Sequence, residues 1–242
     1  MLSSEYNSHN KRVFARFDAT DASATIERLV EAIEHDGGVI VKNLISSSLA
    51  WQIKSDLKPY FDNDIPDKYG FFPLTTKRAT SLFARSDACI ELACNPRYIS
   101  VANALVSSSH TFWRGDHKET VTGKPIISTT VGFRVEPGGK QQVLHRDDKL
   151  VDSPSLLKRL TDNVISDYHV GDAEKPVMIG CVTALTKTTK ENGATIAIPG
   201  SHLWGPERRP LNEEAVPAEL NPGDALIFLG NLYHAGGANF TQ

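Results

Sequence analysis

Few features of the sequence point to a secreted or membrane-embedded protein. Its three cysteines, Cys89, Cys94 and Cys181, are odd in number and have no C-x-x-C spacing, so they indicate neither a disulfide framework nor a zinc ribbon. No segment approaches the roughly 18 continuous apolar residues of a membrane span. The first residues also lack the charged and apolar regions of a signal peptide. We therefore expect a soluble, cytoplasmic protein with no membrane partner.

The sequence also lacks a long run of like charges. Acidic and basic residues are interspersed, and the formal net charge is −3. A basic stripe is the usual mark of a nucleic-acid-binding protein. Its absence argues against a nucleic-acid partner and leaves a small-molecule partner open.

The chain has 242 residues, of which 40% are hydrophobic, enough for one sizeable core. We predict a single domain over residues 1–242. Residues 1–20 are a polar extension, residues 21–107 a mostly helical support, and residues 108–242 the β-rich core.

Helical periodicity is concentrated in the N-terminal half. Over residues 26–33, apolar side chains recur at i, i+3, i+4 and i+7, and Gly37 supplies a stop. A buried strand is predicted at residues 39–41. Ser46 is a candidate N-cap for a second helix, which we expect Pro59 to end.

Less regular sequence follows. Residues 62–80 contain proline, glycine and aromatic residues without periodicity, which predicts a long loop that either binds substrate or simply connects elements. Residues 86–107 predict two helices broken at Asn95-Pro96.

The C-terminal half is rich in short β-prone segments separated by glycine and proline turns. Residues 177–185 form an apolar run typical of a strand buried on both faces, whereas residues 149–175 are a polar excursion suited to a substrate loop. This order predicts a mainly β fold with packed helices, namely a double-stranded β-helix, the jelly-roll barrel of cupins. The amphipathic helices would cover one outer sheet. Further strands are expected at residues 111–114, 126–135, 195–199 and 225–229.

Three side chains form a candidate metal site. His145 and Asp147 point to the same side if they lie on a strand, because side chains alternate between faces. His234 follows a downstream apolar strand and can supply a third ligand. Two histidines and one carboxylate make the facial triad of non-haem Fe(II) oxygenases, which leaves coordination positions open. His-x-Asp alone is weak evidence, since a surface turn with a satisfied histidine is the commoner reading.

The surrounding motifs strengthen this prediction. Glu191-Asn192-Gly193-Ala194-Thr195, Pro199-Gly200-Ser201-His202 and Pro222-Gly223-Asp224 lie between His-x-Asp and His234. This order resembles the phytanoyl-CoA dioxygenase family, and within it the fungal enzymes that oxidise meroterpenoids and alkaloids. The resemblance is firm over residues 130–242 and extends to the N-terminal part only in its general layout. In that pattern His202 belongs to a structural turn and is not a ligand.

The resemblance implies His145, Asp147 and His234 as catalytic iron ligands, with 2-oxoglutarate and O2 as co-substrates. Gln142 and Thr195 match positions that contact 2-oxoglutarate. The family's arginine that anchors the distal carboxylate is expected beyond Gln242, together with a final barrel strand. If that arginine were lacking, the co-substrate assignment would fail. Two further positions, Phe133 and Leu150, are candidates for lining the substrate pocket, although either suits an ordinary core.

The implied reaction is oxidation of a bulky, apolar secondary metabolite such as a meroterpenoid, by hydroxylation, desaturation, rearrangement or endoperoxidation. The presence of Asp147 disfavours halogenation, because halogenases lose this carboxylate. Two alternatives stay open: a redox-neutral isomerase or epimerase on the same barrel, and a non-catalytic jelly-roll binding module. A homodimer is compatible with the sequence, which does not determine the oligomeric state.

Overall fold

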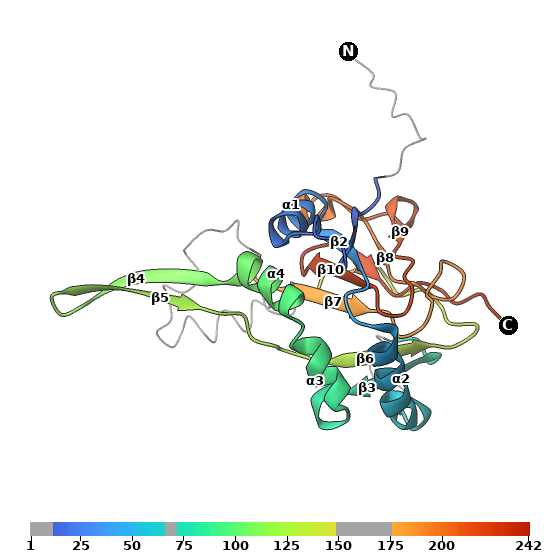
Figure 1. Ribbon diagram of the computed structural model, residues 1–242. Helices are drawn as coiled ribbons and strands as arrows, with labels where there is room; N and C mark the ends of the chain where they lie inside the picture. The colour runs from blue at the N-terminus through green and yellow to red at the C-terminus, as the bar shows by residue number, and fades with distance from the viewer. Residues whose placement is uncertain (1–11, 66–71, 149–175) are drawn as a thin grey trace, which may run out of the picture.

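Two β-sheets lie face to face at the centre of the protein, and helices cover the outer side of one of them (Figure 1). The computed structural model describes residues 12–65, 72–148 and 176–242. The first sheet has the order β1-β2-β10-β7, and all its neighbours are antiparallel except β1 and β2. The second has the antiparallel order β11-β8-β9. The strands are β1 (Arg16–Asp18), β2 (Gly38–Lys42), β7 (Ile179–Thr183), β8 (Ile196–Ala197), β9 (Val216–Pro217), β10 (Ala225–Leu229) and β11 (His234–Ala235).

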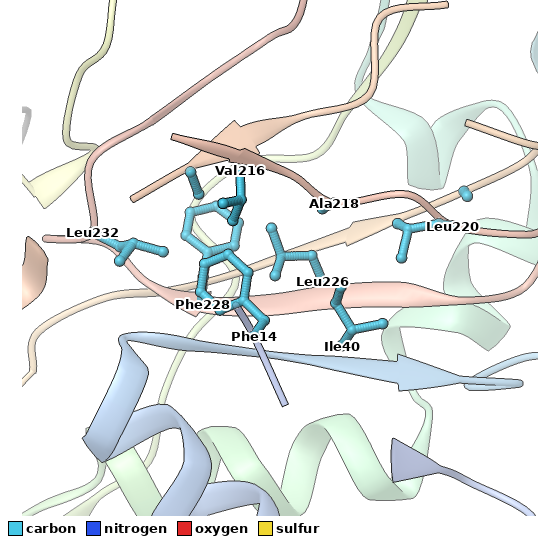
Figure 2. Close-up of a cluster of buried hydrophobic side chains, with 10 residues drawn as sticks. Phe14, Ile40, Val216, Ala218, Leu220, Leu226, Phe228 and Leu232 are labelled. Carbon is cyan, nitrogen blue, oxygen red and sulfur yellow. The ribbon is translucent and has the colours of Figure 1, made fainter. Parts of the chain in front are cut away.

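Strand β10 is the central strand on which the core is built. Successive side chains of a strand alternate between its faces. Leu226 and Phe228 point into the cluster between the two sheets, which Figure 2 shows with β8 and β9 on its far side. Ala225, Ile227 and Leu229 point the other way, toward α1 (Ile26–Asp36) and α4 (Pro96–Val106). The apolar run of residues 225–229 is therefore explained by burial on both faces.

Helix α1 follows its sequence signals. The hydroxyl of Thr25 accepts a hydrogen bond from the backbone N–H of Arg28, and Gly37 ends the helix in the left-handed conformation with φ 79°. Leu29 and Ile33 are completely buried against the first sheet. The predicted helices on one outer sheet are thus confirmed.

Helix α2 (Ser47–Asp62) begins after Ser46 as predicted, but it does not end at Pro59. That prediction was wrong. Proline fits the φ angle of a helix and removes only one backbone hydrogen bond. Phe61, in the last turn, is buried in a cluster with Leu57, and this packing favours the extra turn.

The break at Asn95 is confirmed, because its side chain caps α4 directly after α3 (Asp87–Ala93). The predicted loop over residues 62–80 was partly wrong. Strand β3 (Thr76–Thr80) pairs there with β6 (Val131–Val135). Only Thr76 and Ala79 of β3 are buried, so apolar and polar residues do not alternate along this segment. Its strand depends on pairing with a segment far along the chain, which the local sequence does not reveal. Within the predicted strand at residues 126–135, only β6 is a strand.

Strands β4 (Ser108–Arg114) and β5 (His117–Gly123) form a hairpin that projects from the body (Figure 1). Polar residues dominate β5, so its sequence gave no strand signal. The expectation that the run at residues 177–185 is buried on both faces was wrong. Val182 of β7 is 37% exposed, and among the described residues β7 lies at the edge of its sheet; Val177, which precedes β7, is 61% exposed.

The predicted fold class is confirmed at the level of strands in sheets with packed helices. Within the ranges that the structure describes, no helix has the length and apolar character needed to cross a membrane. Short 3-10 helices complete the described elements: η1 (Leu82–Ala84), η3 (Ser201–Leu203) and η4 (Asn212–Glu214).

Candidate metal centre

His145 and His234 are brought together by their own backbones. Each donates its backbone N–H to the carbonyl of the other, with N–O distances of 2.9 Å in both directions. The two imidazole rings lie 4.6 Å apart between centroids. An antiparallel bridge thus places two histidines from distant parts of the chain side by side.

Both imidazoles are oriented by a hydrogen bond to the backbone carbonyl of the residue two positions earlier in the chain. Nδ1 of His145 lies 2.9 Å from the carbonyl oxygen of Val143, and Nδ1 of His234 lies 3.0 Å from that of Leu232. A carbonyl can only accept a hydrogen bond, so each Nδ1 carries the proton. In the neutral imidazole, the lone pair then lies on Nε2, the form that binds a metal ion.

Asp147 faces both Nε2 atoms. Its carboxylate oxygens lie 3.8 Å from Nε2 of His145 and 3.6 Å from Nε2 of His234. One donor atom from each of the three residues lies within 4.8 Å of the others. The structure therefore brings the predicted ligands together, although not on a regular strand. Residues 141–147 form no strand apart from the bridge at His145. Asp147 is held by its backbone N–H, which donates to the carbonyl of Gly230.

The site is buried on one side and open on the other. The side chain of His234 is 10% exposed, whereas that of Asp147 is 34% exposed. Burial lowers the pKa of His234 from its ordinary value of 6.5, because a charged imidazole loses its hydration. The ring of Phe228 packs on His234 at 4.6 Å between centroids and is part of the buried wall.

The residues next to the ligands form a second set of contacts. Arg146 makes an ion pair with Asp148, and its guanidinium lies 5.9 Å from the ring centre of Tyr233. Arg146 and Tyr233 each neighbour a ligand in the sequence. The two ligand segments are thus joined by side chains as well as by the backbone bridge.

The predicted co-substrate residues lie on segments that flank the ligands. The Oε1 atom of Gln142 accepts the N–H of Gly236 at 2.9 Å, so its amide NH2 remains for another partner. Thr195 lies two residues before Ala197, so alternation places the two side chains on the same face. Ala197 is buried between the sheets beside His234. Within the described ranges, no hydrogen bond is made by the Thr195 hydroxyl. Both side chains can therefore offer a donor to an anion.

The two predicted substrate residues have different outcomes. Phe133 is 51% exposed and lies 5.4 Å from the ring of Phe72, measured between centroids. Arg78 packs on Phe72, and its guanidinium lies 5.1 Å from the centre of the Phe72 ring. Leu150 lies outside the described residues.

His202 is not part of the cluster. Its Nε2 donates to the carbonyl of Glu34 at 3.0 Å, as expected for a structural turn. Sequence reasoning missed Ser201, whose hydroxyl accepts the N–H of Tyr233, and Phe228, whose ring packs on His234. The signal for Phe228 was its place in the buried run before His234, where alternation puts it on the inner face.

Comparison with known proteins now decides the family. The phytanoyl-CoA dioxygenase (PhyH) description matches residues 33–242. The chain belongs to the phytanoyl-CoA dioxygenase family. It is 32% identical to the dioxygenase himG of Aspergillus japonicus, over the whole of this chain and 72% of that relative. The predicted family and the enzyme class, a non-haem iron, 2-oxoglutarate-dependent dioxygenase, are thereby confirmed.

Solved structures show the same fold. The non-haem α-ketoglutarate-dependent carbocyclase SnoK from nogalamycin biosynthesis superposes with a TM-score of 0.61 at 14% identity, covering 92% of this chain and 81% of SnoK. HygX from Streptomyces hygroscopicus, with nickel, 2-oxoglutarate and hygromycin B bound, has a TM-score of 0.59 at 18% identity, covering 89% of this chain and 82% of HygX. At these identities the likeness concerns the fold alone.

Proposed function

We propose that His145, Asp147 and His234 bind Fe(II), and that this PhyH-family enzyme uses 2-oxoglutarate and O2 to oxidise a bulky, apolar secondary metabolite. The observation that carries the proposal is the orientation of the two imidazoles. Both Nδ1 atoms donate hydrogen bonds to backbone carbonyls, and both Nε2 atoms face the carboxylate of Asp147. Two neutral imidazoles and one carboxylate suit Fe(II) and leave positions for other ligands.

The residues present fit such an ion without rearrangement of their hydrogen bonds. A histidine ligand in proteins usually donates its other ring N–H to a carbonyl or a carboxylate, which fixes its tautomer. His145 and His234 already do so. When bound, iron and 2-oxoglutarate would supply the oxidising power for attack on an unactivated C–H bond.

The protein would contribute position and exclusion of water. Gln142 and Thr195 are proposed to hydrogen-bond 2-oxoglutarate through the amide NH2 and the hydroxyl, because both lie on segments adjacent to β11 and have donors to spare. Phe228 closes the buried side beside His234. The open side at Asp147 is left for the substrate.

An apolar substrate suits the exposed aromatic pair of Phe133 and Phe72. Aromatic faces bury much apolar area with few degrees of freedom. Val143, next to the site in the sequence, is 74% exposed. Natural products also occur with the compared structures: HygX has hygromycin B bound, and SnoK comes from nogalamycin biosynthesis. Leu150 is retained as a second substrate contact.

We infer the double-stranded β-helix for the barrel itself. The support is two facing sheets with a shared core, and a backbone bridge that joins His145 to His234 of β11. The helices α1 and α4 lie outside the first sheet, as expected for this barrel with an N-terminal helical support.

The test is succinate formation from 2-oxoglutarate under air, with Fe(II) and a panel of fungal meroterpenoids and alkaloids. Compound-dependent succinate release that is lost in His145→Ala supports the proposal. Full activity in Asp147→Ala would refute it. Turnover without O2 and 2-oxoglutarate would indicate a redox-neutral isomerase instead, and failure to bind Fe(II) or Mn(II) would indicate a binding module.

A further inference from the structure

The backbone of Tyr233, the residue just before His234, is held on both sides by one short segment. Its N–H donates to the hydroxyl of Ser201 at 2.9 Å, and its carbonyl accepts the N–H of Ile198 at 3.0 Å. Ser201 is completely buried, with 0% of its surface exposed. A side-chain hydroxyl therefore takes the place of a backbone acceptor at the start of β11.

The segment that carries Ser201 is itself fixed to a helix. The N–H of Gly200 donates to the carbonyl of Asp36 at 2.7 Å, and Nε2 of His202 donates to that of Glu34 at 3.0 Å. Both acceptors lie in the last turn of α1. The carbonyl of His202 in turn accepts the side-chain amide of Asn231 at 3.1 Å. Residues 198–202 thus form a bracket between α1 and the loop that leads to His234.

Strand β11 contains only His234 and Ala235, so few ladder bonds determine its position. His234 pairs with His145 on one side and lies opposite Ala197 on the other. The bond from Ser201 acts one residue before the ligand. A shift of the Tyr233 backbone would pass directly to the Cα atom of His234 and change the direction of its imidazole.

We propose that Ser201 is a positioning residue that fixes the direction in which the His234 imidazole points toward the metal. Its hydroxyl accepts the N–H of Tyr233, and within the described parts of the chain that N–H makes no other hydrogen bond. Loss of the hydroxyl leaves the N–H unpaired in a buried place, which is unfavourable. The backbone must then move toward another acceptor or admit water. This inference rests on the metal role proposed for His234.

The test compares two Ser→Ala variants of the whole protein. Ser201→Ala removes the acceptor of Tyr233. Ser86→Ala is the matched control, since Ser86 is 6% exposed and its hydroxyl accepts the N–H of Cys89 at the start of α3. It also donates to Asp56. Both variants lose a buried hydroxyl, but Ser86 lies between α2 and α3, away from the ligands.

Co(II) is the probe, with its dissociation constant measured by calorimetry and its visible absorption bands recorded. Support beyond a ligand typically changes metal affinity by about 10- to 100-fold. We expect Ser201→Ala to weaken Co(II) binding at least about tenfold and to alter the absorption bands. Ser86→Ala should keep the wild-type spectrum and an affinity within about twofold of wild type, even if its melting temperature falls equally.

Equal Co(II) affinities and spectra for the two Ser→Ala variants would overturn the positioning role. If Ser201→Ala does not fold, Ser201→Cys carries the test, because a thiol is a weak acceptor of similar size. A Ser201→Cys affinity equal to wild type would likewise overturn the inference. His234→Ala separates the two proposals: if it binds Co(II) as wild type does, the metal site itself is wrong, whatever Ser201 does.

Discussion

Phe228 lies across from Gly180 on the neighbouring strand, and its ring occupies the space that a side chain there would need. The two residues are register partners in the antiparallel pair of β10 and β7. A Cβ atom added to Gly180 would lie 2.5 Å from Cζ of Phe228. On its other side the ring rests on His234. The absence of a side chain at Gly180 thus allows an aromatic ring to support a candidate metal ligand.

Gly180→Ala should therefore disturb both the core and the metal site. The Phe228 ring has to move, and overpacking of this kind costs about 1–3 kcal/mol of unfolding free energy. We expect Co(II) affinity to fall as well, because the wall behind His234 is displaced. Denaturant unfolding and calorimetry measure the two effects.

Gly205→Ala is the control for this substitution, since no atom lies within 4 Å of a Cβ there. The double variant Gly180→Ala/Phe228→Leu should recover part of the lost stability, because a smaller side chain makes room. If Gly180→Ala unfolds and binds Co(II) as Gly205→Ala does, the proposed support of His234 by Phe228 is wrong.

Asp147→Asn should abolish specific metal binding. The amide keeps the size of the side chain but removes the charge that faces the two Nε2 atoms. Loss of a direct ligand should exceed the effect of about 10- to 100-fold typical of outer contacts. Calorimetric titration with Mn(II) or Co(II) measures it.

Asp148→Asn makes the same change one residue further along, at a carboxylate that pairs with Arg146. It should lower the thermal stability and leave the metal affinity within about threefold. Wild-type affinity in Asp147→Asn, or an equal loss in both variants, would contradict the assignment of Asp147.

Phe133→Ala tests the apolar substrate face. Removal of the ring that contacts Phe72 should raise KM about tenfold for any panel compound that is turned over, equivalent to about 1.4 kcal/mol of binding. The change in kcat should be small, because Phe133 is not among the ligands. Phe112→Ala on the projecting hairpin, where the ring is 42% exposed, should leave both constants unchanged. Identical kinetics in the two variants would remove Phe133 from the substrate site.

The stability of the metal-free protein should fall below about pH 6.5, in part because of His202. Burial, and next the nearby Arg12, lower its pKa from the ordinary 6.5, against the opposing bond to Glu34 and the charge of Asp36. Below pH 6.5 the unfolded chain binds a proton at this residue that the folded chain does not yet bind. The free energy of unfolding therefore rises with pH between the lowered pKa of the folded state and pH 6.5, and it decreases as the pH falls through that range.

His202→Gln should flatten this dependence, although the variant starts from a lower stability. His117→Gln, at an exposed position of the hairpin, should keep the wild-type slope. Melting temperatures from pH 7.5 to 5 provide the measurement. An unchanged slope in His202→Gln would show that this imidazole does not titrate differently in the folded state. Part of the slope should persist in any case, because burial also lowers the pKa of His234.

Local signals predicted the elements that are stabilised by near neighbours in the chain. The end of α1 at Gly37, the N-cap of α2 at Ser46 and the start of α4 after Asn95 depend on contacts within a few residues. The order of the motifs around His-x-Asp likewise indicated the family. Predictions failed where the stabilising contact is distant. Strand β3 exists through its pairing with β6, and α2 passes Pro59 because Phe61 finds a buried place.

The residue types available for a metal site, and the order in which they occur, follow from the amino-acid sequence because they are properties of the linear chain. The resemblance predicted that His145 and His234 share a metal ion, but the sequence could not determine that their backbones pair, or that Ser201 holds Tyr233. Those contacts join residues far apart in the sequence, and their geometry depends on how the two sheets pack. Only the tertiary structure decides them, since the free energy that fixes each side chain comes from neighbours that the linear sequence does not identify.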